Sequence, residues 1–161
     1  MADNRWRAFL DTNVLIAGLA SRTGASAAIL DLGEAEEILV VMSRHVLLEA
    51  HRVFEAKFPH LTGQFRLFIK NLTPLLIDDP KPQALSEAGR VIEPGDAPIL
   101  AAVPGLPVAP ARAGKGQQLD YLVTLDKKHF ITPKVRNYVT TPIVTPAEFL
   151  MAFRRFWGKA G

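Results

Sequence analysis

The 161-residue sequence contains no cysteine and no run of about 18 uninterrupted apolar residues. Without cysteine there can be no disulfide bond and no thiolate metal site, so a metal site here needs oxygen or imidazole ligands. Without a long apolar run, we expect no membrane-spanning helix. The apolar stretch near the start is interrupted by Asp11 and Asn13, which disfavours a secretory signal. We therefore predict a cytoplasmic protein.

Charge of neither sign dominates the chain. The formal net charge is +3 and 16 residues are acidic, while the sequence pI is near 9.4. A basic balance alone is weak evidence for a polyanionic partner. It gains weight if the acidic residues gather in one place, because the remaining surface is then more positive. The length and the 48% hydrophobic content indicate a single folded domain over residues 1–161.

Short β-like runs alternate with helical patterns along the sequence. We predict five strands, at about 6–10, 37–42, 74–77, 120–125 and 141–145. We predict helices from about residue 12, at 25–32 with Gly33 as the stop, from Ser43 to about 58, around 65–72, at 84–90, from Asp96, and from Thr145 to the end. This order predicts an α/β fold: a three-layer α/β/α sandwich with a central, mostly parallel sheet of about five strands.

The last helix begins with a sequence typical of a capping box. Thr145 is the predicted N-cap, Pro146 the first helical residue, and Glu148 lies three residues after the cap. Between the helix at Asp96 and the fourth strand, residues 104–118 contain three prolines and three glycines. We interpret this stretch as a loop insertion within the single domain.

Acidic residues mark the carboxyl edge of the predicted sheet, where ligands of such folds bind. Asp11 and Asp126 follow the first and fourth strands, and Asp96 begins a helix that leads toward the fourth strand. Glu49 lies on or beside the apolar face of the helix that leaves the second strand. Each aspartate could instead be a helix cap, worth about 1 kcal/mol, and Glu49 could simply face water.

The four carboxylates together favour a metal site. Converging carboxylates repel one another, and a divalent cation removes that penalty. Oxygen ligands suit Mg²⁺ or Mn²⁺ rather than Zn²⁺, and such ions assist hydrolysis at phosphorus. We expect the Asp11 carboxylate to face the other three acids rather than the amides of its own helix. With a basic surface, this arrangement predicts metal-dependent hydrolysis of a nucleic-acid backbone.

Four segments, in order, resemble the acidic motifs of PIN-domain proteins. They are "LDTNVLIAGL", "SRHVLLEAHRV", "EPGDAPILAA" and "LDYLVTLDKKHF". The closing "TPIVTPAEFL" is similar to the last strand and helix of the PIN subgroup labelled as toxin components of toxin-antitoxin pairs. The resemblance covers nearly the whole chain. It implies an Mg²⁺- or Mn²⁺-dependent endoribonuclease that cleaves single-stranded RNA, with an antitoxin protein as a candidate partner.

Carried over residue by residue, the resemblance implies which side chains form the site. Asp11, Glu49, Asp96 and Asp126 would be the catalytic and metal-binding acids. Thr12, Asn13 and Thr124 would orient the acids or a water molecule, although local turn bonding and strand propensity explain them equally well. Asp120 is a rival for the fourth acid. It should lie about 20 Å from Asp126 at the other edge of the sheet, so we expect it to brace a turn.

Basic residues cluster after the fourth acid and in the predicted loop. The candidates for RNA binding are Lys127, Lys128, Lys134 and Arg136, together with Arg112 and Lys115 of the 104–118 loop. A solvated surface is the simpler explanation for the first four, and a loop without function for the last two. We assign His129 a structural role, because the proposed chemistry needs no imidazole.

Two other functions remain as alternatives. A catalytically impaired PIN-like module that only binds RNA or protein is one, since the insertion could displace Asp96. A phospho-accepting receiver is the other, but it predicts an adjacent acidic pair where this chain has Asp11 and Thr12. The final helix ends in Phe156 and Trp157, which would either pack inside the domain or form a homodimer contact.

Overall fold

A five-stranded parallel sheet forms the centre of the structure. The computed structural model describes residues 4–103 and 119–158 of the chain. In spatial order the strands are β3 (Leu75–Ile77), β2 (Ile38–Ser43), β1 (Trp6–Leu10), β4 (Tyr121–Val123) and β5 (Ile143–Val144). All four strand pairings are parallel. The predicted three-layer α/β/α sandwich is confirmed.

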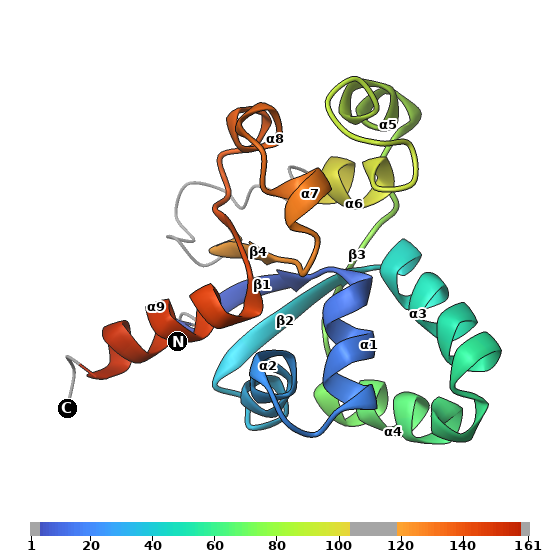
Figure 1. Cartoon of the computed structure of the whole chain (residues 1–161), viewed down its shortest axis with the longest axis vertical. Coiled ribbons are helices and arrows are strands. Elements are labelled where there is room, and N and C mark those ends of the chain that lie inside the picture. The colour runs from blue at the N-terminus through green and yellow to red at the C-terminus, as the bar shows by residue number, and fades with distance from the viewer. Residues whose placement is uncertain (1–3, 104–118, 159–161) are drawn as a thin grey trace.

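Helices cover both faces of this sheet (Figure 1). On one face lie α1 (Thr12–Ala20), α2 (Ala25–Glu34), α4 (Thr62–Leu72) and α9 (Pro146–Gly158). On the other lie α5 (Pro82–Ala88), α6 (Ala97–Ala102), α7 (Lys127–Phe130) and α8 (Pro133–Tyr138). The remaining elements are α3 (Arg44–Lys57), which packs on α1, and the short η1 (Pro59–Leu61) that joins α3 to α4.

The central strands are apolar on both sides because helices cover both faces. In β1, the side chains of Ala8, Phe9 and Leu10 are fully buried. Leu10 is aligned with Val123 of β4, so the residues that follow these two strands emerge side by side. This register is what brings the ends of β1 and β4 together at the carboxyl edge.

Local signals place several helix ends as predicted. The Ser43 hydroxyl caps α3 by accepting a hydrogen bond from the amide of Val46 at 3.3 Å. At α9, Thr145 Oγ1 accepts from the Glu148 amide at 3.3 Å, and Glu148 Oε1 accepts from the Thr145 amide at 3.2 Å. These bonds hold the pKa of the Glu148 carboxyl below its ordinary value. The capping box is confirmed.

The prediction that Gly33 stops the second helix is wrong. Helix α2 continues to Glu34, and the chain turns at Glu36, which has a positive φ of 60°. A Cβ atom on Gly33 would lie 2.7 Å from a Leu72 side-chain carbon and 2.8 Å from one of Val40. Glycine is therefore needed here for close packing of α2 against β2 and α4, not for a helix stop.

Within the described ranges, no single helix is long and apolar enough to cross a membrane; α1 and α2 reach the required length and composition only as a pair bent by 94°. The predicted loop at 104–118, with Arg112 and Lys115, lies outside the described residues.

Candidate functional site

The carboxyl ends of β1 and β4 are tied together by hydrogen bonds. The amide of Asp11, directly after β1, donates to the carbonyl of Val123 at 3.0 Å. Thr124, the first residue after β4, is fully buried, and Asp126 follows two residues later as the N-cap of α7. Two of the predicted acids therefore leave neighbouring strands at the same edge of the sheet.

Asp11 is buried and hydrogen-bonded at both oxygens. Its side chain is 4% exposed. Oδ1 accepts from the amide of Thr12 at 2.7 Å, which caps α1. Oδ2 accepts from Thr124 Oγ1 at 2.7 Å and from Asn13 Nδ2 at 3.1 Å. The expectation that Asp11 turns away from the amides of its own helix is wrong, because Oδ1 accepts a hydrogen bond from the Thr12 amide at the start of α1.

Burial raises the pKa of Asp11 to about 6. The hydrogen bonds from Thr124 and Thr12 act in the opposite direction, and the negative charges of Asp96 and Glu49 raise the pKa further. Asp11 is thus within electrostatic reach of two other predicted acids. Among the described residues, the largest contributions to this pKa shift include no positively charged side chain, so the ionised carboxylate is stabilised mainly by its hydrogen bonds.

Thr124 joins Asp11 to the turn that carries Asp126. Its hydroxyl donates to Asp11 and also accepts from the amide of Asp126 at 3.0 Å. Asn13 completes the link, because its Oδ1 accepts from the amide of Leu125 at 3.1 Å. These two polar side chains fix the geometry between the start of α1 and the end of β4.

Thr12 makes the corresponding link to α3. Its hydroxyl donates to Glu49 Oε2 at 2.8 Å. The same carboxylate oxygen lies 3.5 Å from His45 Nε2, one helical turn earlier. Glu49 is half-exposed beside the buried face of α3, as its spacing predicts, and Thr12 holds it toward the N-terminus of α1.

Among the residues that the structure describes, Asp96, Asp126 and His129 form a compact cluster of potential metal ligands. His129 Nδ1 lies 2.8 Å from Asp126 Oδ2 and 3.4 Å from Asp96 Oδ2. One donor atom from each residue lies within 4.8 Å of the other two. Burial and the Asp126 charge raise the pKa of Asp96, and His129 opposes this shift. The residues N-terminal to α6 and α7 thus meet at this edge.

His129 joins Asp96 and Asp126 in this cluster, a contact that its predicted structural role did not include. The spacing of three residues from Asp126 is a usable signal, since such positions are neighbours on a helix. The contact with Asp96 could not be read from the sequence, because the two residues are 33 positions apart. Within residues 4–103 and 119–158, this grouping includes neither Asp11 nor Glu49, so the four predicted acids do not form one contact cluster.

Asp120 lies at the opposite end of β4 from Asp126. Its Oδ2 accepts a hydrogen bond from the amide of Arg7, near the start of β1, at 2.8 Å. The carboxylate thus fastens the chain before β4 to β1. The prediction that Asp120 lies at the amino edge of the sheet, away from Asp126, is confirmed, but its carboxylate bonds to strand β1 rather than bracing a turn.

The predicted RNA-binding residues of α7 and α8 are exposed. They are Lys127, Lys128, Lys134 and Arg136. Arg136 also donates from its guanidinium to the carbonyl of Ile143 at 3.5 Å. Both helices lie on the face of the sheet that carries α6 (Figure 1), and Lys127 and Lys128 directly follow Asp126 in the sequence.

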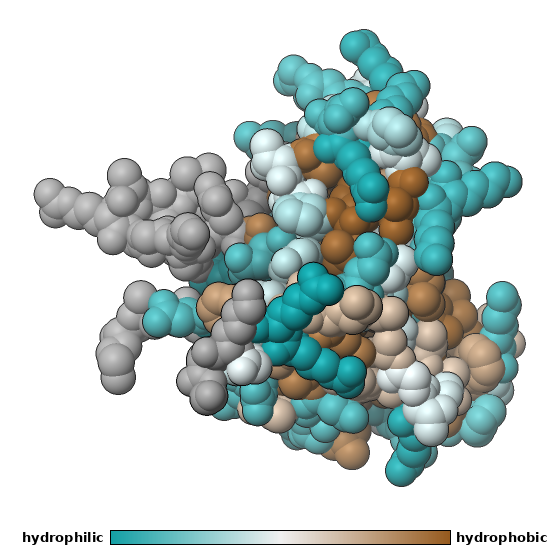
Figure 2. All heavy atoms as spheres, turned by 60° about the vertical axis from the view of Figure 1, so that its left-hand side comes forward, coloured by the Kyte–Doolittle hydropathy of each residue, from teal (hydrophilic) through white to brown (hydrophobic). Residues whose placement is uncertain are grey.

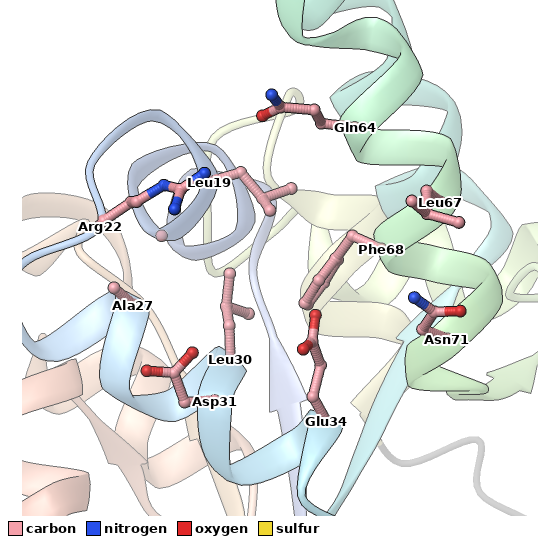
Figure 3. Close-up of a pocket in the computed structure, with 11 residues that line it drawn as sticks. Leu19, Arg22, Ala27, Leu30, Asp31, Glu34, Gln64, Leu67, Phe68 and Asn71 are labelled. Atoms are coloured by element: carbon pink, nitrogen blue, oxygen red, sulfur yellow. The ribbon is translucent and has the colours of Figure 1, made fainter.

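A groove of about 590 Å³ lies between α1, α2 and α4. Figure 3 shows Asp31 and Glu34 of α2 on one side and Gln64, Leu67 and Asn71 of α4 on the other. The groove takes Gly18 and Leu19 from the C-terminal half of α1, whereas Asp11 precedes its N-terminus. It is therefore separate from the acidic edge.

The end of α9 is exposed. Phe156 and Trp157 have exposed fractions of 54% and 46%, and their rings meet edge to face at 5.3 Å. Figure 2, which brings forward the left-hand side of Figure 1, shows hydrophobic residues reaching the surface among hydrophilic ones. Both rings also contact the domain, since Phe156 lies 5.3 Å from the Trp6 ring and Trp157 lies 6.0 Å from the Phe153 ring, so about half of each side chain remains open for a contact with another molecule.

Comparison with known proteins gives one family and several solved structures, two of which follow. A family model described as the PIN domain matches residues 7–103. PAE2754 from Pyrobaculum aerophilum is 16% identical with a TM-score of 0.52, covering 91% of this chain and 88% of that chain. The second structure is VapBC2 from Rickettsia felis bound to a DNA fragment from its promoter. It is 17% identical with a TM-score of 0.53, and the match covers 86% of this chain and 98% of that chain. No curated protein sequence matches the chain.

Proposed function

Because the chain belongs to the PIN-domain family, which supports a nuclease, we propose that it is a metal-dependent endoribonuclease. It hydrolyses phosphodiester bonds of single-stranded RNA at the carboxyl edge of its sheet. The observation that carries this proposal is the gathering of predicted acids there: Asp96 and Asp126 form a compact group with His129, and the negative charges of Asp96 and Glu49 act on Asp11. Asp11 is buried with its pKa raised to about 6, and the pKa of Asp96 is raised by burial and by Asp126.

The chemistry of the donor set fits Mg²⁺ or Mn²⁺. Asp96 and Asp126 present carboxylate oxygens next to each other, and Glu49 presents a half-exposed carboxylate held by Thr12. Oxygen-rich sites that keep water ligands suit these ions. Asp96 and Asp126 would hold the ion directly, with Glu49 and Asp11 supplying further negative charge around it.

A bound divalent ion lowers the pKa of its water and stabilises the charge that develops on phosphate oxygens. The chain's own residues prepare the surroundings. Thr124 and Asn13 fix the orientation of the Asp11 carboxylate, and Thr124 also holds the amide of Asp126. These bonds keep the acids in place without the nucleic acid, which reduces the reorganisation needed when RNA binds.

The exposed cations of α7 and α8 give a route for the RNA backbone into the site. Lys127 and Lys128 directly follow Asp126, and Lys134 and Arg136 continue the series. Salt-dependent contacts from such residues neutralise phosphates on single strands. Arg112 and Lys115 remain candidates for the same role.

The position of Asp96 supports a nuclease over a catalytically impaired binding module. Helix α6 is only six residues long, which could have moved Asp96 out of reach. Asp96 Oδ2 nevertheless lies 3.4 Å from His129 Nδ1, beside Asp126. The short helix therefore keeps its acid at the edge of the sheet.

We extend the proposal to partners. A toxin role requires an antitoxin protein that binds this chain, and the similarity in fold to VapBC2 supports looking for one. A second copy of the chain is a further candidate, for which the exposed Phe156 and Trp157 offer an apolar contact. Co-expression with the product of a neighbouring gene, followed by size-exclusion chromatography, tests both.

Cleavage of a labelled single-stranded RNA with Mg²⁺ or Mn²⁺ tests the nuclease. We expect wild type to cleave, Asp11→Asn to be severely impaired, and chelation to abolish the reaction. Asp120→Asn is the matched control, because it removes an acid at the other end of the sheet and keeps an oxygen for the Arg7 amide. Equal cleavage by wild type and Asp11→Asn would reject the proposal.

A further inference from the structure

We infer that His129 supplies a nitrogen ligand to the cation held by Asp96 and Asp126, which makes the site prefer Mn²⁺ to Mg²⁺. This inference rests on the proposed metal-dependent function and adds a residue and a selectivity to it. The imidazole contacts both carboxylates, at 2.8 Å from Asp126 and 3.4 Å from Asp96.

The distances fit the corners of a coordination octahedron. Ligand bonds of about 2.1 Å at right angles put adjacent donor atoms about 3.0 Å apart. His129 Nδ1 lies 2.8 Å from Asp126 Oδ2 and 3.4 Å from Asp96 Oδ2. All three donors lie within 4.8 Å of one another. A bound ion would replace the direct contact between His129 Nδ1 and Asp126 Oδ2 with a bond from each of these atoms to itself.

The backbone of α7 prepares His129 for this role. Asp126 Oδ1 accepts a hydrogen bond from the amide of His129 at 3.0 Å. That bond caps the helix with one carboxylate oxygen and leaves Oδ2 facing the imidazole. The side chains of Asp126 and His129 are thus fixed relative to each other by the turn itself, and both remain partly open to solvent.

The other histidine contacts differ from this one. His45 and His51 each lie 3.5 Å from one glutamate on the next turn of α3, Glu49 and Glu55. Such surface pairs are common on helices. Among the residues that the structure describes, His129 alone has such contacts with two carboxylates from different elements. The convergence of α6 and α7 on one ring nitrogen is the feature that points to a ligand.

An imidazole ligand changes which ion the site favours. Mg²⁺ prefers oxygen donors at short, nearly ideal octahedral distances. Transition metals gain more from an imidazole nitrogen than Mg²⁺ does. The competing explanation is that His129 only neutralises the two acids as an ion-pair partner, in which case the ring leaves when the cation binds.

Pulsed EPR of Mn²⁺ bound to the full chain distinguishes these two roles. A directly bound imidazole gives strong ¹⁴N modulation. We expect this signal in wild type and its absence in His129→Gln. The Mn²⁺ affinity of His129→Gln should fall about tenfold or more, with a smaller change for Mg²⁺. His51→Gln is the matched control and should keep the wild-type signal, since its partners, Glu55 and Arg66, lie on α3 and α4.

A second variant guards against a folding defect. His129→Asn places an amide near the position of Nδ1 and should keep Mg²⁺ binding while losing the ¹⁴N modulation. If wild type binds Mn²⁺ and cleaves RNA without that modulation, His129 is not a ligand and the proposed nuclease stands. If wild type binds no Mn²⁺ and cleaves no RNA, both proposals fail.

Discussion

Asp11 and Asp126 follow neighbouring strands and both cap the next helix, yet their surroundings differ. Asp11 is 4% exposed, and each of its oxygens is bonded to a group from its own helix or from Thr124. The Asp126 side chain is 24% exposed and turns one oxygen toward His129 and Asp96. One strand end therefore provides a fixed buried charge, and the other provides an accessible ligand.

This difference explains how one edge can be both rigid and reactive. A buried carboxylate held by three donors has little freedom to follow a substrate. A partly exposed one can bind an ion together with water. Thr124 connects the two, because its hydroxyl bonds to the carboxylate of Asp11 and to the amide of Asp126. The following predictions test how the two ends depend on each other.

The largest effect should come from removing the open ligand. We expect Asp126→Asn to reduce RNA cleavage about 1,000-fold, because the substitution removes a negatively charged ligand that acts on the transition state. Single-turnover cleavage at saturating Mn²⁺ measures it. Asp120→Asn should cleave at a rate within about twofold of wild type. A modest effect of Asp126→Asn would assign the metal to other residues.

The buried carboxyl of Asp11 should make the stability of the protein depend on pH. For metal-free protein, Asp11 loses its proton near pH 3.8 when unfolded and near pH 6 when folded. Between these values the folded state binds more protons, so the free energy of unfolding falls as pH rises, by about 3 kcal/mol from this group. Above pH 6 this contribution is constant.

Urea unfolding from pH 4 to pH 7 in the presence of chelator tests this prediction. The fall should be smaller in Asp11→Asn, which has no group to ionise at this position. Added Mn²⁺ should raise the stability of wild type more at pH 7 than at pH 4.5, since bound cations favour ionised carboxylates. Parallel pH profiles for wild type and Asp11→Asn would show that Asp11 does not carry this effect.

Removing the Thr124 hydroxyl, which links Asp11 to Asp126, should have an intermediate effect. We expect Thr124→Val to cost about 1–3 kcal/mol of unfolding free energy, because a buried carboxylate oxygen and the Asp126 amide lose a partner. Cleavage should fall about 10- to 100-fold. Thr124→Ser keeps the hydroxyl and should retain most of both properties. Chemical denaturation measures the change in unfolding free energy of both variants, and cleavage assays measure the change in rate.

The smallest effect should come from the surrounding cations. Lys127→Gln and Lys134→Gln should each weaken binding of single-stranded RNA and reduce the slope of log affinity against log salt by about 0.7. Lys70→Gln on α4, across the sheet, is the matched control (Figure 1). Fluorescence anisotropy in Ca²⁺ over a salt series gives the slopes, and equal slopes for all variants would place the RNA elsewhere.

Hydrophobic period and local caps were sufficient to predict most of the fold. The five strands, the cap at Ser43 and the capping box at Thr145 depend on residues close in sequence. The role of Gly33 could not be predicted, because it depends on Leu72 and Val40, which meet it only in the folded structure. Local patterns predict elements well, while close approaches between elements need the coordinates.

The same distinction applies to the candidate site. The position of Asp11 at the end of a strand was readable from the sequence, but its bond with the Thr124 hydroxyl joins residues 113 positions apart and was not. The contact of His129 with Asp96 could not be read from the sequence, because Asp96 lies 33 positions earlier at the start of α6. Sequence patterns therefore found acids at the edge and could not show which of them touch.

Calorimetric titration of Mn²⁺ into metal-free protein tests the central claim most directly. The account predicts saturable binding by wild type and by Asp120→Asn, and binding weakened at least about tenfold in Asp126→Asn. Absence of saturable binding in wild type, or equal affinity in wild type and Asp126→Asn, would contradict it.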